Sequence, residues 1–249
     1  MSKKENNNPQ FVNGEIYHVI SRAVGDTVIF KNEDDFYRGI FSIYEFNNSE
    51  LIEIWRRRRD RVVKKHKEKL WGVRHPTKSA FTSMDKRDKF VEILAFCFMP
   101  NHIHLLVRQL KDDGISQFMK KVGGGYANYF NKKYNRKGHL FNKFKAVHIS
   151  SDDQLRNIFA YIHCNPISLI EPGWKEKYIR NTNKVMKFLK GYKWSSYPDY
   201  IGTKNFPSVI SKDLFYEIIG GPEKCKETVL DWIKYKNEIN FGTDKIFLE

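Results

Sequence analysis

The pattern of apolar and polar positions predicts four short β-strands, of which the first shows alternation and the second is apolar enough to be a buried strand. Pro100-Asn101 separates the second segment from the third and predicts the turn of a β-hairpin. The segments predicted as strands are 15–22, 89–99, 102–108 and 145–150.

Helical spacing of apolar residues predicts a helix after the first, third and fourth of these strands. The first covers about 33–48, where Asn32 is a good N-cap residue and is followed by acids. The second is long and contains Gly123-Gly124-Gly125, which predicts a kink, a local break or a close backbone approach. The third begins after Ser151 and ends before Pro166.

The order βαββαβα predicts an α+β fold. We expect a ferredoxin-like antiparallel sheet with helices packed on one face, together with a basic insertion and a small helical C-terminal extension. The expected organisation is a flexible polar arm at 1–10, a catalytic core at 11–189 with the insertion at about 50–88, and the extension at 190–249. Within the extension, helices are predicted near 213–219 and 226–235.

The charge of the chain changes the range of expected partners. Lys and Arg number 44 against 29 Asp and Glu, which gives a net charge of +15. Such an excess favours a polyanionic partner, nucleic acid first and an anionic membrane surface second. The basic run at 56–69 contains Arg56, Arg57, Arg58 and Arg59. We interpret this run as an arm that contacts phosphate, with a solvated or disordered insertion as the alternative.

Other features of composition favour a soluble, cytoplasmic protein that associates with the nucleoid when it binds DNA. No apolar run approaches the roughly 20 residues of a membrane span, and the first ten residues do not resemble a signal peptide. Cys97, Cys164 and Cys225 are far apart in the sequence. Their spacing predicts neither a disulfide framework nor a zinc ribbon.

A pair of histidines lies on the third predicted strand. Alternate side chains of a strand share a face, so His102 and His104 project together while Ile103 points into the opposite layer. Two imidazoles at this spacing suit a divalent cation. Two histidines on a solvated strand face would give the same pattern.

Tyr161 and Asn165 lie four residues apart on the helix that ends before Pro166, so their side chains share a flank of that helix. A half-buried tyrosine followed by a helix-terminal asparagine would look the same. If this helix lies against the histidine strand, His102, His104 and Asn165 could form a metal site with open positions. A metal that polarises a phosphate would make attack by the Tyr161 phenol feasible and give a covalent phosphotyrosine.

A second basic cluster lies between the long helix and the fourth strand, where cations alternate with Tyr134 and Phe141. Cations for phosphates and rings for bases are typical of a single-strand binding site. The predicted DNA-contacting cations here are Lys132, Lys133, Arg136, Lys137, Lys143 and Lys145. A solvated helix end is the alternative.

Three ordered motifs of the chain resemble those of a known family. FMPNHIHLLV (98–107), YANYFNKKYNRKGHLFNKFKAVHI (126–149) and YIHCNPI (161–167) resemble the single-tyrosine HUH transposases, in particular the REP-associated tyrosine transposases and their insertion-sequence relatives. YHVISRA (17–23) resembles the first strand of that family, and KWSSYPDYIG (193–202) resembles a stretch that follows its core.

This resemblance implies a ferredoxin-like core that binds single-stranded or hairpin DNA and nicks it with Mg²⁺ or Mn²⁺. It also implies a covalent bond between the tyrosine and a 5′ phosphate. By position, His102 and His104 would be the metal-binding pair, Tyr161 the nucleophile and Asn165 the third metal ligand. The implied partner is DNA, a second copy of the chain is a further candidate partner, and no membrane is implied.

Two other functions fit the same residues. A non-catalytic or domesticated nucleic-acid-binding protein would keep the fold and the basic surface without cleaving DNA. A zinc or iron hydrolase would use His102 and His104 and would need a nearby carboxylate, for which Glu92 is the best candidate on a strand.

Overall fold

The computed structural model of the protein describes residues 11–50, 87–176 and 179–239. Its centre is one four-stranded antiparallel sheet with the order β2-β3-β1-β4. This order, with a helix after β1 and another after β3, confirms the predicted α+β fold of ferredoxin-like character. The strands are β1 (Ile16–Arg22), β2 (Val91–Met99), β3 (His102–Gln109) and β4 (Lys145–Ile149).

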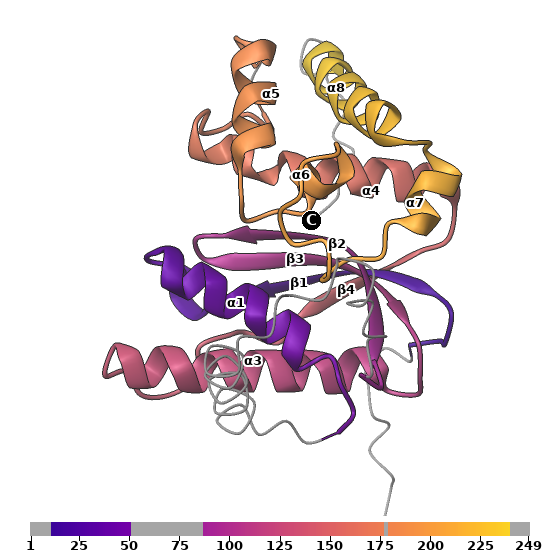
Figure 1. The fold of residues 1–249 in the computed structure, drawn as a ribbon. Helices are drawn as coiled ribbons and strands as arrows, with labels where there is room; N and C mark the ends of the chain where they lie inside the picture. The colour runs from indigo at the N-terminus through magenta and orange to yellow at the C-terminus, as the bar shows by residue number, and fades with distance from the viewer. Residues whose placement is uncertain (1–10, 51–86, 177–178, 240–249) are drawn as a thin grey trace, which may run out of the picture.

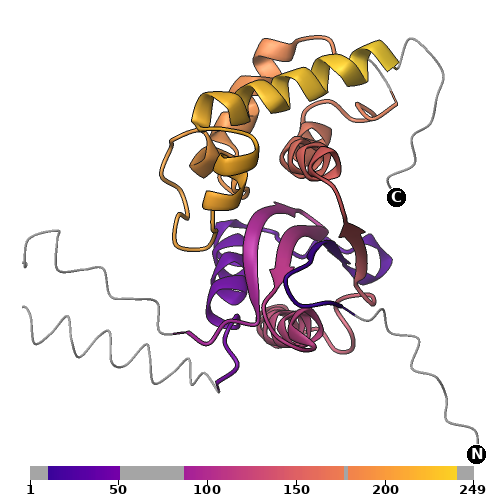
Figure 2. The same cartoon turned by 90° about the vertical axis from the view of Figure 1, so that its right-hand side faces the viewer.

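Helices cover both faces of this sheet. Helices α1 (Glu33–Glu45) and α3 (Gly114–Lys133) lie on one face, and α4 (Asp152–Cys164) lies on the other (Figures 1 and 2). The prediction of helices on one face therefore holds for α1 and α3 but not for α4. The physical reason is that β2 is buried along nearly its whole length, so both of its faces need an apolar cover.

The C-terminal residues extend the layer that contains α4. Helix α8 packs against α4 and runs across the top of the molecule in Figure 2. The segment around Trp194, just before α6, also pairs with the free edge of β2. The Phe98 amide donates a hydrogen bond to the Trp194 carbonyl at 2.8 Å. The elements here are η3 (Asn165–Leu169), α5 (Thr182–Gly191), α6 (Tyr197–Tyr200), α7 (Asp213–Ile218) and α8 (Pro222–Ile239). The sequence predicted α7 and α8 but not α5.

Both predicted helix caps are present. The Asn32 side chain accepts a hydrogen bond from the Asp35 amide at 3.2 Å, and the Ser151 hydroxyl accepts one from the Gln154 amide at 3.3 Å. Each satisfies a backbone donor that the first turn of a helix leaves without a partner. The caps therefore fix where α1 and α4 begin.

A buried carboxylate joins α1 to the end of α3. Asp35 is fully buried, and it accepts hydrogen bonds from Lys133 at 2.7 Å, Tyr134 at 2.7 Å and Tyr129 at 3.0 Å. Burial alone would raise the pKa of Asp35, but these bonds and one from the Lys31 amide lower it overall. The ammonium of Lys133, which the sequence assigned to DNA, thus compensates a buried charge.

The glycine triplet of α3 does not break the helix. An added Cβ at Gly125 would lie 2.2 Å from the ring of Phe46, whereas one at Gly124 would meet nothing within 4 Å. Of the three outcomes considered for the triplet, a close approach is the one found. Only Gly125 has a packing reason to lack a side chain.

Some predicted features fall on residues that the structure does not describe. The polar arm 1–10 and most of the basic insertion, including Arg56 to Arg59, lie outside the described residues.

Cys97, Cys164 and Cys225 are buried free thiols. Within the described part of the chain, no helix has the length and apolar character needed to cross a bilayer.

The glycine triplet generates a paired prediction about stability. Gly124→Ala should raise the free energy of unfolding by up to about 1 kcal/mol, since alanine is the better helix former. Gly125→Ala should be less stable than Gly124→Ala by at least about 1 kcal/mol, because the Phe46 ring must move. Urea titration followed by circular dichroism measures both. Equal stabilisation by the two substitutions would contradict the contact.

Candidate active site

Three imidazoles gather on the sheet face that α4 covers. His102 and His104 share that face of β3, and their ring centroids are 4.9 Å apart. His18 of β1 joins them, with its ring stacked at 5.2 Å from that of His104. Strand pairing explains the position of His18. It lies opposite Leu106 on β3, and Leu106 is two residues along β3 from His104, so the side chains of His18 and His104 project from the same face. The sequence alone gave no reason to include His18.

In both His102 and His104, Nδ1 is the ring nitrogen that takes part in a hydrogen bond within the protein. His104 Nδ1 lies 3.0 Å from His18 Nε2, and His102 Nδ1 lies 2.6 Å from the Asn101 side-chain oxygen. An amide oxygen only accepts, so His102 Nδ1 donates and leaves a lone pair on Nε2. His104 Nε2 is buried and has no hydrogen-bond partner among the described residues. In the tautomer in which His104 Nδ1–H donates to His18 Nε2, His104 Nε2 also offers a lone pair, which is the arrangement of a metal-binding histidine.

The environment keeps these imidazoles uncharged. Burial lowers the pKa of His102 to about 4, assisted by the charges of Arg22 and Lys175. Burial also lowers the pKa of His18 to about 4 and that of His104 far below its usual range. Neutral imidazole is the form that binds a metal ion. The donor chemistry of His102 and His104 therefore fits a divalent cation.

Tyr161 lies beside the imidazoles. Its ring centroid is 5.8 Å from that of His104 and 6.0 Å from that of His18, both edge-on. The apolar stripe of α4, which includes Ile158 and Ile162, is buried and holds the helix against the sheet. The condition on which the sequence argument depended, that this helix lies against the histidine strand, is met.

Lys175 follows η3 and reaches back to the phenol of Tyr161. Its ammonium donates a hydrogen bond to Tyr161 Oη at 3.0 Å and lies 5.0 Å from the centre of the tyrosine ring. A charge-assisted hydrogen bond of this kind stabilises negative charge on the oxygen that accepts it. Sequence reasoning missed Lys175, because nothing in the spacing between residues 161 and 175 indicates the contact.

Asn165 is buried at the end of α4. Its side-chain nitrogen donates to the backbone oxygen of Tyr161 at 2.9 Å, which orients the amide and leaves its side-chain oxygen to accept. An amide oxygen is a suitable ligand for Mg²⁺ or Mn²⁺. The assignment of Asn165 as a third ligand stays a prediction.

Two cations share the histidine face of the sheet. Arg22 pairs with His102 across β1 and β3, so the two side chains project on the same side. Lys145 of the edge strand β4 pairs with Ile20, which itself pairs with His104. Arg22 and Lys145 could therefore contact a DNA backbone that reaches the imidazoles. The sequence analysis predicted that Lys145 contacts DNA but did not include Arg22.

The other predicted DNA-contacting cations divide between two places. Lys143 follows Asn142, whose amide bonds to the Arg22 carbonyl, so it lies at the same end of the sheet as His102. The rest are at the end of α3, in the layer opposite the histidines: Lys132, Lys133, Arg136 and Lys137. Arg136 donates to the side-chain oxygen of Asn131. DNA contact by these residues stays a prediction.

The geometry disfavours a hydrolase with Glu92 as a metal ligand. Glu92 pairs with Arg108 at the far end of the hairpin and forms an ion pair with it, whereas His102 pairs with Met99. Within the described ranges, no group of three His, Cys, Asp or Glu residues is arranged to hold a metal.

Comparison with known families identifies the chain. A sequence model of the family described as "Transposase IS200 like" matches residues 47–165, which include the histidine pair, Tyr161 and Asn165. Over this stretch, which is slightly less than half of the chain, the protein is similar to the IS200-like transposases. This confirms the predicted relationship to the single-tyrosine transposases.

Two solved structures resemble this chain at low identity. One is a REP-associated tyrosine transposase bound to a REP hairpin, with 13% identity, a TM-score of 0.45, and coverage of 86% of this chain and 93% of the other. The other is a bacterial tRNA(His) guanylyltransferase-like protein in complex with GTP, with 10% identity, a TM-score of 0.35, and coverage of 68% and 72%. Similarity at this level says nothing about function. No curated protein matches the chain.

The contact between His18 and His104 generates a prediction about metal affinity. His18→Ala should weaken Mn²⁺ binding by about 10- to 100-fold, because the partner that orients His104 is lost. Isothermal titration with Mn²⁺ measures this, with circular dichroism to check the fold. His139→Ala, at an exposed histidine, is the matched control and should bind Mn²⁺ as the unmodified protein does. Unchanged affinity in His18→Ala would contradict a supporting role for His18.

Proposed function

We propose that this transposase cuts and rejoins DNA through a covalent bond between Tyr161 and a 5′ phosphate. The observation that carries the proposal is that the Tyr161 ring lies 5.8 Å from the ring of His104, whose buried Nε2 has no hydrogen-bond partner in the part of the chain that the structure describes. A tyrosine, an imidazole pair and a cation from separate elements meet on one sheet face. The net charge of +15 supports DNA as the partner.

The chemistry requires the following from residues of this chain. Tyr161 Oη attacks the scissile phosphorus, so an O–P bond forms while the bond from phosphorus to the 3′ oxygen breaks. The phenolic proton passes to water, and the leaving oxygen takes up a proton to become a 3′ hydroxyl. The phosphotyrosine conserves the energy of the broken bond, so attack by another 3′ hydroxyl rejoins the strand without a further energy source.

His102 and His104, with Asn165 as the third ligand, would hold a divalent ion, Mg²⁺ or Mn²⁺. When bound, such an ion polarises the scissile phosphate and offsets the charge that develops on its oxygens. The substrate is single-stranded or hairpin DNA, because an unpaired strand can reach a tyrosine that is only 7% exposed. The protein would act in the cytoplasm, on the DNA of the nucleoid.

The role of Tyr161 is tested by trapping the covalent product. Protein, Mn²⁺ and 3′-labelled hairpin oligonucleotides should give a labelled species that survives SDS, since the phosphotyrosine retains the strand on the 3′ side of the cut. Tyr161→Phe should abolish it. Tyr235→Phe, at an exposed tyrosine, is the matched control. An adduct that persists in Tyr161→Phe would exclude Tyr161 as the nucleophile. DNA binding without any adduct in the unmodified protein would favour the non-catalytic alternative.

The hydrogen bond from Lys175 generates a separate prediction about rate. Lys175→Met should slow adduct formation by about 10- to 100-fold, because a charge-assisted hydrogen bond to the attacking oxygen is lost. Affinity for the same DNA should change much less than the rate, and Lys175→Arg should restore part of the rate. A loss of affinity equal to the loss of rate would assign Lys175 to DNA binding instead.

A further inference from the structure

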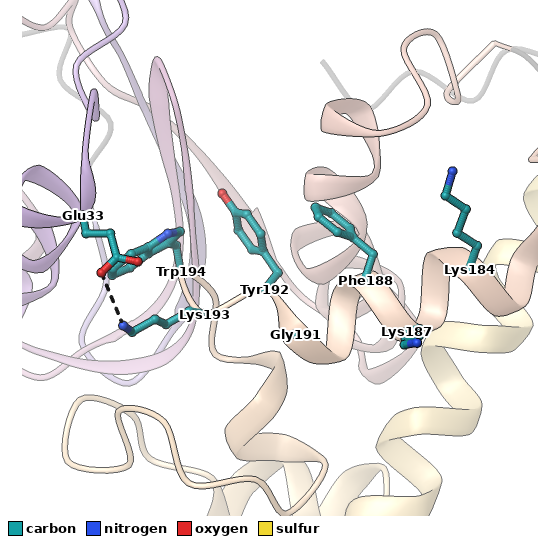
Figure 3. A pocket seen from close by; sticks show the side chains of 8 residues that line it. All are labelled: Glu33, Lys184, Lys187, Phe188, Gly191, Tyr192, Lys193 and Trp194. Carbon is teal, nitrogen blue, oxygen red and sulfur yellow. Dashed lines mark ion pairs between the residues drawn. The ribbon is translucent and has the colours of Figure 1, made fainter.

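A groove lies between helix α5 and the start of α1, apart from the histidine cluster. Its volume is about 610 Å³. Figure 3 shows that Phe188 and Tyr192 line its middle, with Glu33 and Trp194 at the α1 end. The remaining lining residues are Lys184, Lys187, Gly191 and Lys193.

The sequence of α5 places cations and an aromatic ring on the groove side of the helix. Lys184, Lys187, Phe188 and Gly191 recur at the i, i+3, i+4 and i+7 positions, which share one helix face. Both lysines are exposed. Gly191 has no atoms within 4 Å of the position of a Cβ, so the groove is open above it.

Aromatic rings form the floor and the far end of the groove. The rings of Phe188 and Tyr192 are 5.7 Å apart, and the Tyr192 hydroxyl is fixed by donating to the Phe98 carbonyl at 2.7 Å. Trp194 is held by stacking on Phe36 at 4.6 Å. Rings fixed in this way lose little conformational freedom when a flat ligand stacks on them.

The charge of the groove favours an anionic occupant. Three lysines against Glu33 leave two net positive charges, and Glu33 pairs only loosely with Lys193 at 3.9 Å. Glu33 also has a separate reason for its position, since an acid in the first turn stabilises α1. Ammonium groups beside aromatic rings are the combination that binds a single nucleic-acid strand.

The groove also lies near the end of the β2–β3 hairpin that carries the imidazole pair. The Phe98 carbonyl that Tyr192 contacts precedes Met99, and Met99 pairs directly with His102. Neighbouring strands are about 4.8 Å apart, so the groove edge and the imidazole pair belong to the same hairpin end.

We propose that this groove binds one unpaired nucleotide of the DNA substrate, with its phosphate between Lys184 and Lys187 and its base stacked on Phe188. This inference rests on the proposed function only in taking DNA as the partner. The groove would thereby hold the strand outside the active site and fix its direction.

The test measures binding of fluorescent 12-residue oligodeoxythymidine in EDTA, where no cleavage takes place. Lys184→Gln/Lys187→Gln should make the slope of log affinity against log salt shallower by about 0.7, as expected for one lost single-strand phosphate contact. Lys190→Gln/Lys226→Gln removes the same charge from lysines that do not line the groove. This control should leave the slope nearly unchanged. Equal slopes for the two double variants would overturn the proposal.

A second variant fills the groove without removing any packed side chain. Gly191→Glu should weaken oligodeoxythymidine binding by at least about 5-fold, the lower limit for a lost stacked base. Gly124→Glu adds the same charge at another open helical glycine and should have a smaller effect. Normal binding by Gly191→Glu together with a Tyr161 adduct would refute the groove and leave the proposed function intact. Weakened binding by Gly191→Glu, with no Tyr161 adduct in the unmodified protein, would support the groove and contradict the proposed function.

Discussion

The packing of α4 onto the open face of the sheet is the contact on which the rest of the site depends. Its apolar stripe, with Ile158, Phe159 and Ile162, is buried against a sheet face that also contains imidazoles. Burial removes water from those imidazoles, and this lowers their pKa values and keeps them neutral. The same packing brings Tyr161 to the histidines. One hydrophobic contact thus sets both the charge state of the imidazoles and the position of Tyr161 beside them.

The two faces of the sheet serve different purposes. On the α1 and α3 face, the buried Asp35 receives hydrogen bonds on both carboxylate oxygens. On the α4 face, His104 Nε2 is buried without a partner among the described residues. A buried polar atom that lacks a partner costs stability, and such costs are concentrated at functional sites.

The residues after α4 contribute in three ways to a site built from the core. Lys175 reaches the Tyr161 hydroxyl, α8 covers α4, and the segment around Trp194 pairs with the edge of β2. Covering that edge protects backbone groups that could otherwise pair with another chain. The groove beside Trp194 extends the same layer. The C-terminal extension is thus part of the structure that holds the active site.

Local patterns in the sequence determined the strands, the caps at Asn32 and Ser151, the hairpin and the shared face of His102 and His104. Each of these depends on neighbours within a few residues, where backbone geometry fixes which side chains meet. Tertiary structure alone decided that α4 lies on the second face, that Gly125 faces Phe46, and that His18, Arg22 and Lys175 join the site. These contacts depend on strand register and helix docking across long stretches of chain. Register and docking result from the burial of the whole core, which no short stretch of sequence encodes.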